Sequence, residues 1–268
     1  MNYFTIPPPD SLKSFVRCFW VLEHEFGEGE QSYIYRSIAD GCVEMVFHYR
    51  AAFEELVTEG PPHNWLSGIH FQSDRYRRFE TSQSFGIFGA YIYPFAVPLF
   101  FNIPSDKTSN EMLGLDIFLC REGVELEEKI MTAPDNCKRT EILSTFLESR
   151  LAKARLKDDT IATAIKHVIH SSQLNTVPQL ADKFNLSTRQ FDRKFKEYAG
   201  FSPKTYLRLV RLGRAIKQHK SNKSLTRIAY ECGYYDQSHF IRDLKAFTGY
   251  HPGFYFSGKA EGTEYLYV

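Results

Sequence analysis

Cysteine is scarce in this chain of 268 residues, and the few cysteines present form no recognisable pattern. There are five, at positions 18, 42, 120, 137 and 232. Their number is odd and no two of them are spaced as C-x-x-C, which argues against a disulfide framework and against a zinc site. Cysteines used in this way suit a reducing compartment, so a cytoplasmic location is expected.

Long apolar runs are also missing. No stretch approaches the roughly 20 apolar residues that a membrane helix needs, and no membrane partner is expected. The start of the chain, MNYFTIPPPDSL, lacks a basic region followed by an apolar stretch, so no signal peptide is expected. His24, His48, His63 and His70 do not follow the His-x-His pattern with a following Glu and a distant His that a metal-binding cupin requires. We therefore expect no metal, no cofactor and no enzymatic activity.

The net charge of +1 hides an uneven distribution along the chain. Residues 1–157 contain 16 Lys and Arg against 22 Asp and Glu, a balance of −6, whereas residues 158–258 contain 16 against 8, a balance of +8. The last ten residues add −1. A basic C-terminal third on a nearly neutral chain indicates either an anionic partner for that third or an ordinary solvated basic face.

The first hundred residues are typical of strands. In the segment 40–49, an Asp-Gly turn signal precedes Val43, Met45, Phe47 and Tyr49 on one face of a strand, with Cys42, Glu44, Val46 and His48 on the other. Segments 75–81 and 84–93 predict further strands, with Gly86 and Gly89 at bulges or close approaches. Apolar residues at three-to-four spacing predict helices over 116–131 and 140–157.

An internal repeat occupies the C-terminal third. Ser187, Phe191, Arg193, Phe195, Gly200 and Pro203 recur 49 residues later as Asp236, Phe240, Arg242, Leu244, Gly249 and Pro252. Before the turn the offset is 48, so the second copy has one extra residue in its turn. A repeat of this length indicates two copies of one supersecondary unit.

Capping signals identify the unit. Thr176 with Gln179, and Ser187 with Gln190, have the spacing of capping boxes, and Gly200 ends the second helix. In the second copy Asp236 is the cap, and Tyr235 is expected to pack on Phe240 as a hydrophobic staple. Two short helices around a tight turn, the second of them amphipathic, predict a helix-turn-helix.

The outer face of each second helix is the candidate for reading DNA bases. Arginine, glutamine and serine side chains can bond to base edges in the major groove. An ordinary polar exterior is the alternative, and the occurrence of two matching copies on a basic domain argues against it. The candidate base-reading residues are Arg189, Gln190, Asp192, Arg193, Gln237, Ser238, His239 and Arg242.

A connecting helix that begins at Pro203 lies between the two units. About 15 helical residues span roughly 23 Å. With the units packed at either end, this length would place two recognition helices near one turn of DNA apart, roughly 34 Å. The candidate phosphate contacts are Ser187, Lys194, Lys204, Arg208, Arg211 and Lys245.

The segments LADKFNLSTRQFDRKFKEYAGFSPKTYLRLVRLGRA and LTRIAYECGYYDQSHFIRDLKAFTGYHP resemble the DNA-binding domain of the AraC/XylS transcription regulators over about residues 160–256. The resemblance implies an all-α domain of seven helices, with two helix-turn-helix units that enter successive major grooves of double-stranded DNA. Arg189, Arg193, Gln237, Ser238 and Arg242 fall where that family contacts bases. The sequence departs from the family pattern at Leu244, where Phe is usual, and at Asp192, where Gln is often found.

The N-terminal half resembles, less specifically, the uncharacterised domain often joined to such regulators. That implies a β-rich, barrel or cupin-like domain with helices, and a multidomain α+β chain. We expect an N-terminal sensing or dimerisation domain over 1–157, an AraC-type DNA-binding domain over 158–258 and a tail over 259–268. Besides DNA, the candidate partners are RNA polymerase, a small-molecule effector and a second copy of the chain joined through Thr140–Lys157. The alternative for this apolar stripe is burial against the chain's own sheet.

Three other functions are weighed against this one. An architectural DNA-binding protein would have no use for an acidic, aromatic-rich N-terminal half. A small-molecule enzyme could use Glu44 and His48, which share a strand face, although such pairs are more often structural. An alkyl-transfer repair protein needs clustered cysteines, which this chain lacks. The aromatic residues of the N-terminal half either enclose an apolar ligand or simply form the core, and the core is the favoured reading.

Overall fold

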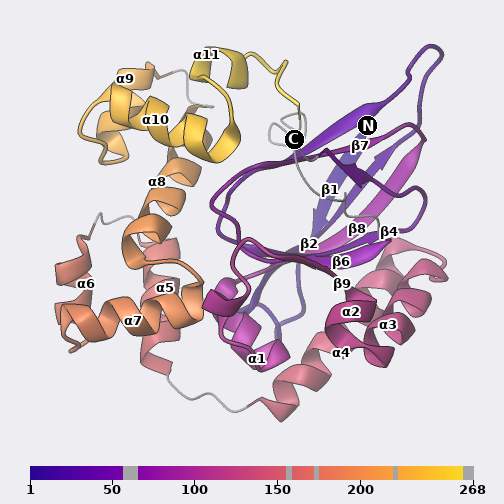
Figure 1. Cartoon of the computed structure of the whole chain (residues 1–268), viewed down its shortest axis with the longest axis horizontal. Helices are drawn as coiled ribbons and strands as arrows, with labels where there is room; N and C mark the ends of the chain where they lie inside the picture. Colours follow the sequence, from indigo (N-terminus) through magenta and orange to yellow (C-terminus); the bar gives the residue numbers. More distant parts are fainter. Residues whose placement is uncertain (57–65, 155–158, 172–174, 220–222, 262–268) are drawn as a thin grey trace.

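A computed structural model describes residues 1–56, 66–154, 159–171, 175–219 and 223–261 of the chain. A β-rich part with helices on one side is followed by a part made only of helices (Figure 1). The α+β organisation expected from the sequence is confirmed. The expected domain boundary at 157/158 lies outside the described residues, as does most of the tail. Within the described ranges, no helix combines the length and the apolar character that crossing a membrane demands.

Two antiparallel sheets make up the β-rich part. The larger has the strand order β1-β2-β8-β4-β6-β9 and the smaller has the order β3-β7-β5. The strands are β1 Asn2–Ile6, β2 Val16–His24, β3 Tyr33–Ser37, β4 Val43–His48, β5 Glu54–Glu55, β6 Ser67–His70, β7 Arg77–Thr81, β8 Phe85–Ile92 and β9 Met112–Gly114. An aromatic-rich core, with Trp20 and Phe85 from the larger sheet and Tyr35 and Phe79 from the smaller, joins the two sheets.

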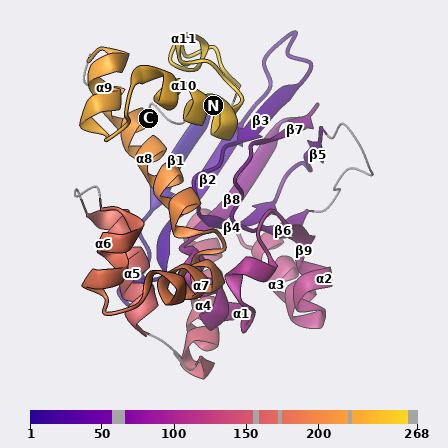
Figure 2. The same ribbon diagram turned by 60° about the vertical axis from the view of Figure 1, so that its left-hand side comes forward.

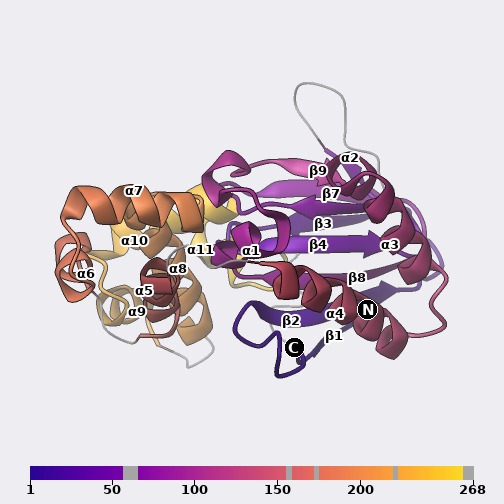
Figure 3. The same cartoon turned by 90° about the horizontal axis from the view of Figure 1, so that it is seen from below.

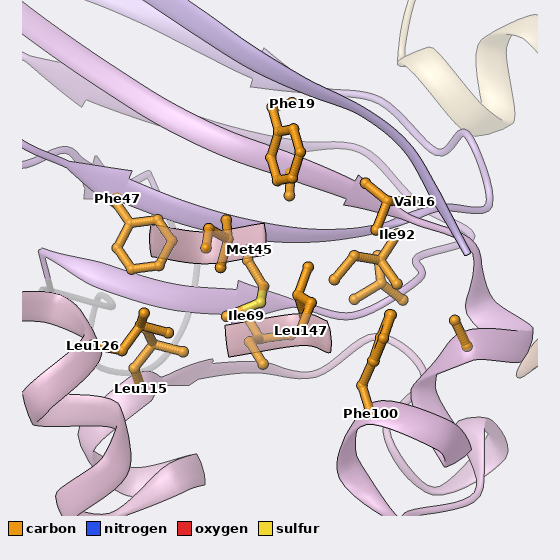
Figure 4. Packing of buried hydrophobic residues seen from close by; sticks show 14 of the residues in the cluster. Val16, Phe19, Met45, Phe47, Ile69, Ile92, Phe100, Leu115, Leu126 and Leu147 are labelled. Atoms are coloured by element: carbon orange, nitrogen blue, oxygen red, sulfur yellow. The ribbon is translucent and has the colours of Figure 1, made fainter. Parts of the chain in front are cut away.

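Strand β4, with the sequence VEMVFH, is buried on both faces, including the polar residues Glu44 and His48. It pairs with β8, with Val43 opposite Ile92 and Phe47 opposite Phe88. The predicted alternation is confirmed: Val43, Met45 and Phe47 enter the core on the helix side, whereas Val46 enters the core between the sheets. Figure 4 shows Met45 and Phe47 among the helix-side core residues.

Two glycines of β8 let large aromatic side chains lie flat against the sheet. A Cβ atom on Gly86 would lie 2.5 Å from Cε2 of Tyr49, and a Cβ atom on Gly89 would lie 2.5 Å from Cε2 of Trp20. The close approach predicted for these two glycines is confirmed. The register irregularity of this strand pair lies elsewhere, between Val16 and Cys18 of β2.

Helices cover one face of the larger sheet (Figure 3). They are α1 Val97–Phe101, α2 Leu115–Leu119, α3 Arg121–Met131 and α4 Asn136–Lys153, with short 3-10 turns η1 Pro94–Ala96 and η2 Ser105–Lys107 before β9. Leu126 of α3 and Leu147 of α4 are buried in the same core as Met45 and Phe47 (Figure 4).

The position of α4 argues against the expected dimer contact through Thr140–Lys157. The apolar stripe that was expected to join two copies of the chain packs on the chain's own sheet instead. Leu143 and Leu147 are fully buried, and Ile142, Phe146 and Leu151 pack against the same core. Among the described residues of this stripe, these apolar side chains therefore pack inside the domain and are not available to join a second copy of the chain.

The helical part consists of α5 Asp159–His170, α6 Val177–Lys183, α7 Thr188–Ala199, α8 Pro203–His219, α9 Leu225–Glu231, α10 Gln237–Thr248 and α11 Pro252–Tyr255. Helix α8 runs between the pair α6–α7 at one of its ends and the pair α9–α10 at the other (Figure 1). Each pair has its own core, one around Phe191 and Phe195 and the other around Phe240 and Leu244. The helical part lies beside the β-rich part of the chain (Figure 2).

Candidate nucleic-acid interface

The first helix pair is defined by its caps. Oγ1 of Thr176 accepts from the Gln179 amide and Oγ of Ser187 accepts from the Gln190 amide, and in both boxes the glutamine side chain accepts from the cap's backbone N–H in return. Asn185, between the helices, has a φ of 54°, a left-handed conformation that asparagine tolerates better than most residues. Both predicted capping boxes are confirmed, and α6, the turn and α7 form the expected unit.

The second pair repeats this construction. The hydroxyl of Ser224 caps α9, and Oδ1 of Asp236 accepts from the His239 amide at 2.7 Å to cap α10. Gly233 takes the place of Asn185 in the turn, with a φ of 74°. Helices α7 and α10 both end at a left-handed glycine, Gly200 and Gly249. The 49-residue sequence repeat is therefore a repeat of structure.

The predicted hydrophobic staple of the second unit was assigned to the wrong tyrosine. Tyr235 is 92% exposed, whereas its neighbour Tyr234 is buried, with its ring 5.4 Å from that of Phe240. The extra residue in the second turn shifts the inward position by one, so the sequence spacing of the first copy does not transfer. Tyr235, in the turn before α10, and Tyr230, on α9, are two largely exposed aromatic side chains of this unit.

The candidate base-reading residues of α7 lie on its outer face. Arg189, Asp192 and Arg193 are exposed, as a groove-reading set must be. Gln190 is also exposed, but its Oε1 atom accepts from the backbone N–H of Ser187 at 3.1 Å, so part of its hydrogen-bonding capacity is used by the cap.

The corresponding residues of α10 differ from one another in exposure and in their contacts. Ser238 and Arg242 are exposed. Gln237 is half-buried and accepts from the hydroxyl of Thr226 at 2.8 Å. His239 is half-buried, with its ring 5.3 Å from that of Tyr234. The two outer faces therefore share an exposed arginine at equivalent positions, Arg193 and Arg242.

Of the candidate phosphate contacts, Lys204 and Lys245 are exposed and Lys194 is half-buried. Ser187 is the N-cap of α7, so it stands at a helix N-terminus, where backbone N–H groups favour an anion. These placements leave the predicted contacts with phosphate untested.

Two arginines of α8 hold the second unit in place. Nη2 of Arg208 donates to Oδ1 of Asp243 at 2.7 Å, and Asp243 is 1% exposed. The guanidinium of Arg211 lies 5.1 Å from the centre of the Tyr234 ring. This role of Arg208 and Arg211 was not predicted from the sequence, where both were candidate phosphate contacts. The available signal was Asp243 itself, since it stands where the first copy has Lys194, and a carboxylate at an inward position needs a cationic partner.

The pair suggested for an enzyme, Glu44 and His48, lies in a small cavity between the two sheets, lined also by Trp20, Phe53 and His70. The cavity volume is about 20 Å³, which is room for about one water molecule. Burial, reinforced by the negative charge of Asp40, raises the pKa of the Glu44 carboxyl to about 8. Among the residues that the structure describes, no three His, Cys, Asp or Glu side chains gather closely enough to hold a metal ion.

Comparison with protein families divides the chain in the same way as the fold. Residues 180–258 match the family described as "Helix-turn-helix domain", and residues 4–113 match the family described as "Domain of unknown function (DUF6597)".

Several curated proteins are similar to the C-terminal part. The HTH-type transcriptional activator RhaS of Escherichia fergusonii is 31% identical over 102 residues, which is 35% of this chain and 36% of the relative. The RhaS protein of Escherichia coli is 30% identical over 141 residues, or 52% and 42% of the two chains. The chain thus spans about two fifths of the length of these relatives.

One solved structure extends the likeness to both parts of the fold. ToxT from Vibrio cholerae aligns over 89% of this chain and 98% of its own, with a TM-score of 0.51 and 13% sequence identity. At this identity the likeness concerns the fold, in which an N-terminal antiparallel-sheet domain precedes a C-terminal helical domain.

Proposed function

We propose that this chain, whose C-terminal part is a helix-turn-helix domain of the AraC type, is a transcription regulator that binds specific DNA sequences. The observation that carries the proposal is the structural repeat of the unit. Two second helices, α7 and α10, have equivalent caps and ends and present equivalent exposed arginines, Arg193 and Arg242. The C-terminal third that contains them has a charge balance of +8, which favours a polyanionic partner.

In this proposal each second helix enters one major groove, and the two grooves follow one another along the duplex. The exposed arginines bond to guanine, for which arginine forms the commonest specific contact. Lys204, Lys245 and the N-terminus of α7 supply contacts to phosphate, which position the protein without reading sequence. The 17 residues of α8 correspond to about 25 Å of helix between the two units.

A small-molecule effector is a second element of the proposal, and a cleft offers it a place. The cleft lies between the β-rich part and α8, has a volume of about 530 Å³ and is lined by residues that include Arg17, Tyr91, Tyr206 and Arg214. This volume lies within the range of about 300 to 1,000 Å³ that is usual for ligand sites. The cavity of about 20 Å³ lined by Glu44 and His48 is too small for the same purpose, although Glu44 also lines the cleft.

The regulator is tested by selecting duplexes from a random pool with the intact protein and footprinting the selected site. Short protected segments in two successive grooves support the proposal. Diffuse coverage with no selected sequence would point instead to an architectural DNA-binding protein. Transcript changes after deletion of the gene then separate a regulator from a sequence-specific binder without regulatory effect.

The effector is tested separately, by a thermal-shift screen of metabolites followed by titration of the selected duplex with each hit. A ligand that controls binding must favour one state of the protein, so a true effector changes DNA affinity as well as melting temperature. A hit that raises the melting temperature and leaves DNA affinity unchanged would make the cleft a binding site without a regulatory role.

A further inference from the structure

Both second helices end against the β-rich part of the chain. Helix α7 ends at Gly200 and α10 ends at Gly249, which are equivalent positions of the repeat with φ angles of 82° and 81°. A left-handed end alone explains a glycine. The structure adds a second reason at each position, because a side chain from the N-terminal half occupies the space that a Cβ atom would fill.

At the first unit, the contact is made by residues between β6 and α2. The hydroxyl of Ser109 donates to the carbonyl of Gly200 at 2.8 Å. A Cβ atom on Gly200 would lie 1.9 Å from Nε2 of Gln72, which is fully buried and donates to the Ser105 carbonyl at 2.7 Å. Beside this contact, Phe95 of η1 is fully buried in the core of the first unit.

At the second unit, the contact is made by β3 and the residues after it. Nη1 of Arg36 donates to the carbonyl of Thr248 at 3.1 Å, and the amide of Ala39 donates to the carbonyl of Phe247 at 3.2 Å. A Cβ atom on Gly249 would lie 2.6 Å from Nη1 of Arg36. The last carbonyls of α10 are thus bonded by the N-terminal half of the chain.

Glu261 completes the second contact from the other end of the sequence. Its carboxylate accepts from Arg36 at 2.9 Å, from Arg78 at 2.6 Å and from the hydroxyl of Tyr250 at 3.1 Å. Arg36 is only 7% exposed, and its guanidinium lies 4.1 Å from the centre of the Tyr250 ring. A cation buried to this degree needs a counter-charge, so removing Glu261 weakens the hold of Arg36 on α10.

We propose that these two contacts position α7 and α10 relative to each other, so that the N-terminal half sets the spacing of the two DNA half-sites. The inference rests on the proposed function. Each unit packs on α8 through its own core and also contacts the β-rich part. The second contact restricts tilting of the unit about α8. A shift of about 3.4 Å along the duplex corresponds to one base pair, so small movements of one unit change the spacing that is recognised.

The first test needs no DNA. Spin labels are attached through cysteines that replace the exposed residues Lys196 on α7 and Ala246 on α10, in a chain whose exposed Cys120 and Cys137 are changed to serine. The same chain without the two new cysteines shows the contribution of residual thiols. Electron paramagnetic resonance then gives the distribution of distances between the helices.

The variants weaken each contact with little loss of volume. They are the pair Ser109→Ala with Arg36→Met, and separately Glu261→Gln. Arg121→Ala, which breaks an exposed ion pair with Glu125 on α3, is the matched control. Circular dichroism shows whether each variant is folded. We expect a broader distribution of distances in both contact variants and an unchanged one in the control. An unchanged distribution in both contact variants would overturn the inference.

The second test uses the duplex selected by the intact protein and versions with one or two base pairs inserted between its half-sites. Wild type should lose affinity on the order of tenfold for one inserted base pair, whereas the contact variants should lose less than about threefold. An equal loss in wild type and variants, or no loss in wild type, contradicts the assigned role. Wild type that binds no duplex would instead defeat the proposed function, while the label distances still decide whether the contacts position the helices.

Discussion

Arg193 and Lys204 are both exposed basic side chains of the helical part, yet they are predicted to do different work. Arg193 lies on the exposed face of α7, which is proposed to read base edges, and Lys204 lies in the first turn of α8. Arg193→Ala should cost roughly 1–3 kcal/mol on the selected duplex and relax the preference at one base position. Lys204→Ala should weaken binding to all sequences alike and flatten the dependence on salt.

Titrations of both variants against the selected and a scrambled duplex, at several salt concentrations, measure these effects. If Arg193→Ala weakens specific and scrambled binding equally, Arg193 contacts only phosphate and the assignment of α7 as a reading helix loses its main support.

Protonation of the buried Glu44 carboxyl makes the free energy of unfolding depend on pH. Burial raises the pKa of its carboxyl to about 8 in the folded protein, whereas an unfolded chain has a glutamate pKa of about 4.3. Between these values the folded state keeps a proton that the unfolded state has lost. The contribution of Glu44 to the free energy of unfolding is therefore full below pH 4 and declines, on the order of a few kcal/mol, as the pH rises to about 8.

Urea unfolding of wild type and Glu44→Gln at a series of pH values measures this contribution, since the glutamine variant cannot titrate. The difference in unfolding free energy between the two proteins should shift in favour of the variant from pH 4.5 to pH 8. A difference that stays constant over this range would show that the carboxyl ionises normally in the folded protein.

At the residue scale, contacts between neighbours in the sequence could be predicted, whereas contacts between distant residues could not. The caps Thr176, Ser187 and Asp236 were predictable because a cap and its partner lie three residues apart. The partnership of Arg208 with Asp243 was not, because it joins two helices 35 residues apart in the chain. Likewise Gly200 and Gly249 were predictable as helix ends, but nothing local to them indicates that Gln72 and Arg36 lie against them.

At the scale of elements, the caps of α7 and α10 define where each second helix starts and how its first turn is presented. Ser187→Ala and Asp236→Ala should each lower the free energy of unfolding by about 1 kcal/mol, because each leaves a backbone N–H without its partner. Thr145→Ala is the control. Its exposed hydroxyl donates to the Glu141 carbonyl within α4, so the change should leave stability unchanged or slightly higher.

Chemical denaturation measures the free energy of unfolding of all three variants in the intact protein. The affinity of each variant for the selected duplex is a second measurement. A loss of stability in the control as large as that in the cap variants would mean that removing any polar side chain from a helix has this effect, and that the caps contribute nothing specific.

Periodicity in the sequence predicted which segments are strands and which are helices. It did not always predict which side chain of an element points into the core. The alternation in 40–49 predicted β4 and the assignment of its two faces, because a period of two leaves few other choices. The staple of α10 was misassigned because one inserted residue in a turn changes which side chain points inward. The resemblance implied only a barrel or cupin-like domain. The arrangement in two sheets did not follow from the sequence, because strand order depends on pairing between distant segments such as β2 and β8.

At the scale of the whole molecule, the two halves of the chain share a core. Phe95, from the N-terminal half, is fully buried against the first helix-turn-helix unit. Phe95→Ala should lower the free energy of unfolding by about 3–5 kcal/mol, the usual cost of removing a buried phenylalanine ring. Phe254→Ala, at a ring that is 48% exposed, should stay within about 0.5 kcal/mol of wild type.

Thermal and urea unfolding of both variants measure the difference, and limited proteolysis between the two halves shows whether Phe95→Ala also separates them. Equal and small effects of the two substitutions would mean that the halves are not joined through this side chain. The two halves could be recognised from the charge distribution and the periodicity of the sequence. The packing of Phe95 against the second half could not, because Phe95 and Phe195 lie about a hundred residues apart in the chain.

The central claim is that the helical part reads DNA sequence, and the affinity of the intact protein for two duplexes tests it most directly. One duplex is the selected site and the other has the same composition in scrambled order. At physiological salt the selected site should bind at least about 1,000-fold more tightly, and the variant Arg193→Ala with Arg242→Ala should lose most of this ratio while keeping its binding to the scrambled duplex. Equal affinity of the wild-type protein for the two duplexes would contradict the account.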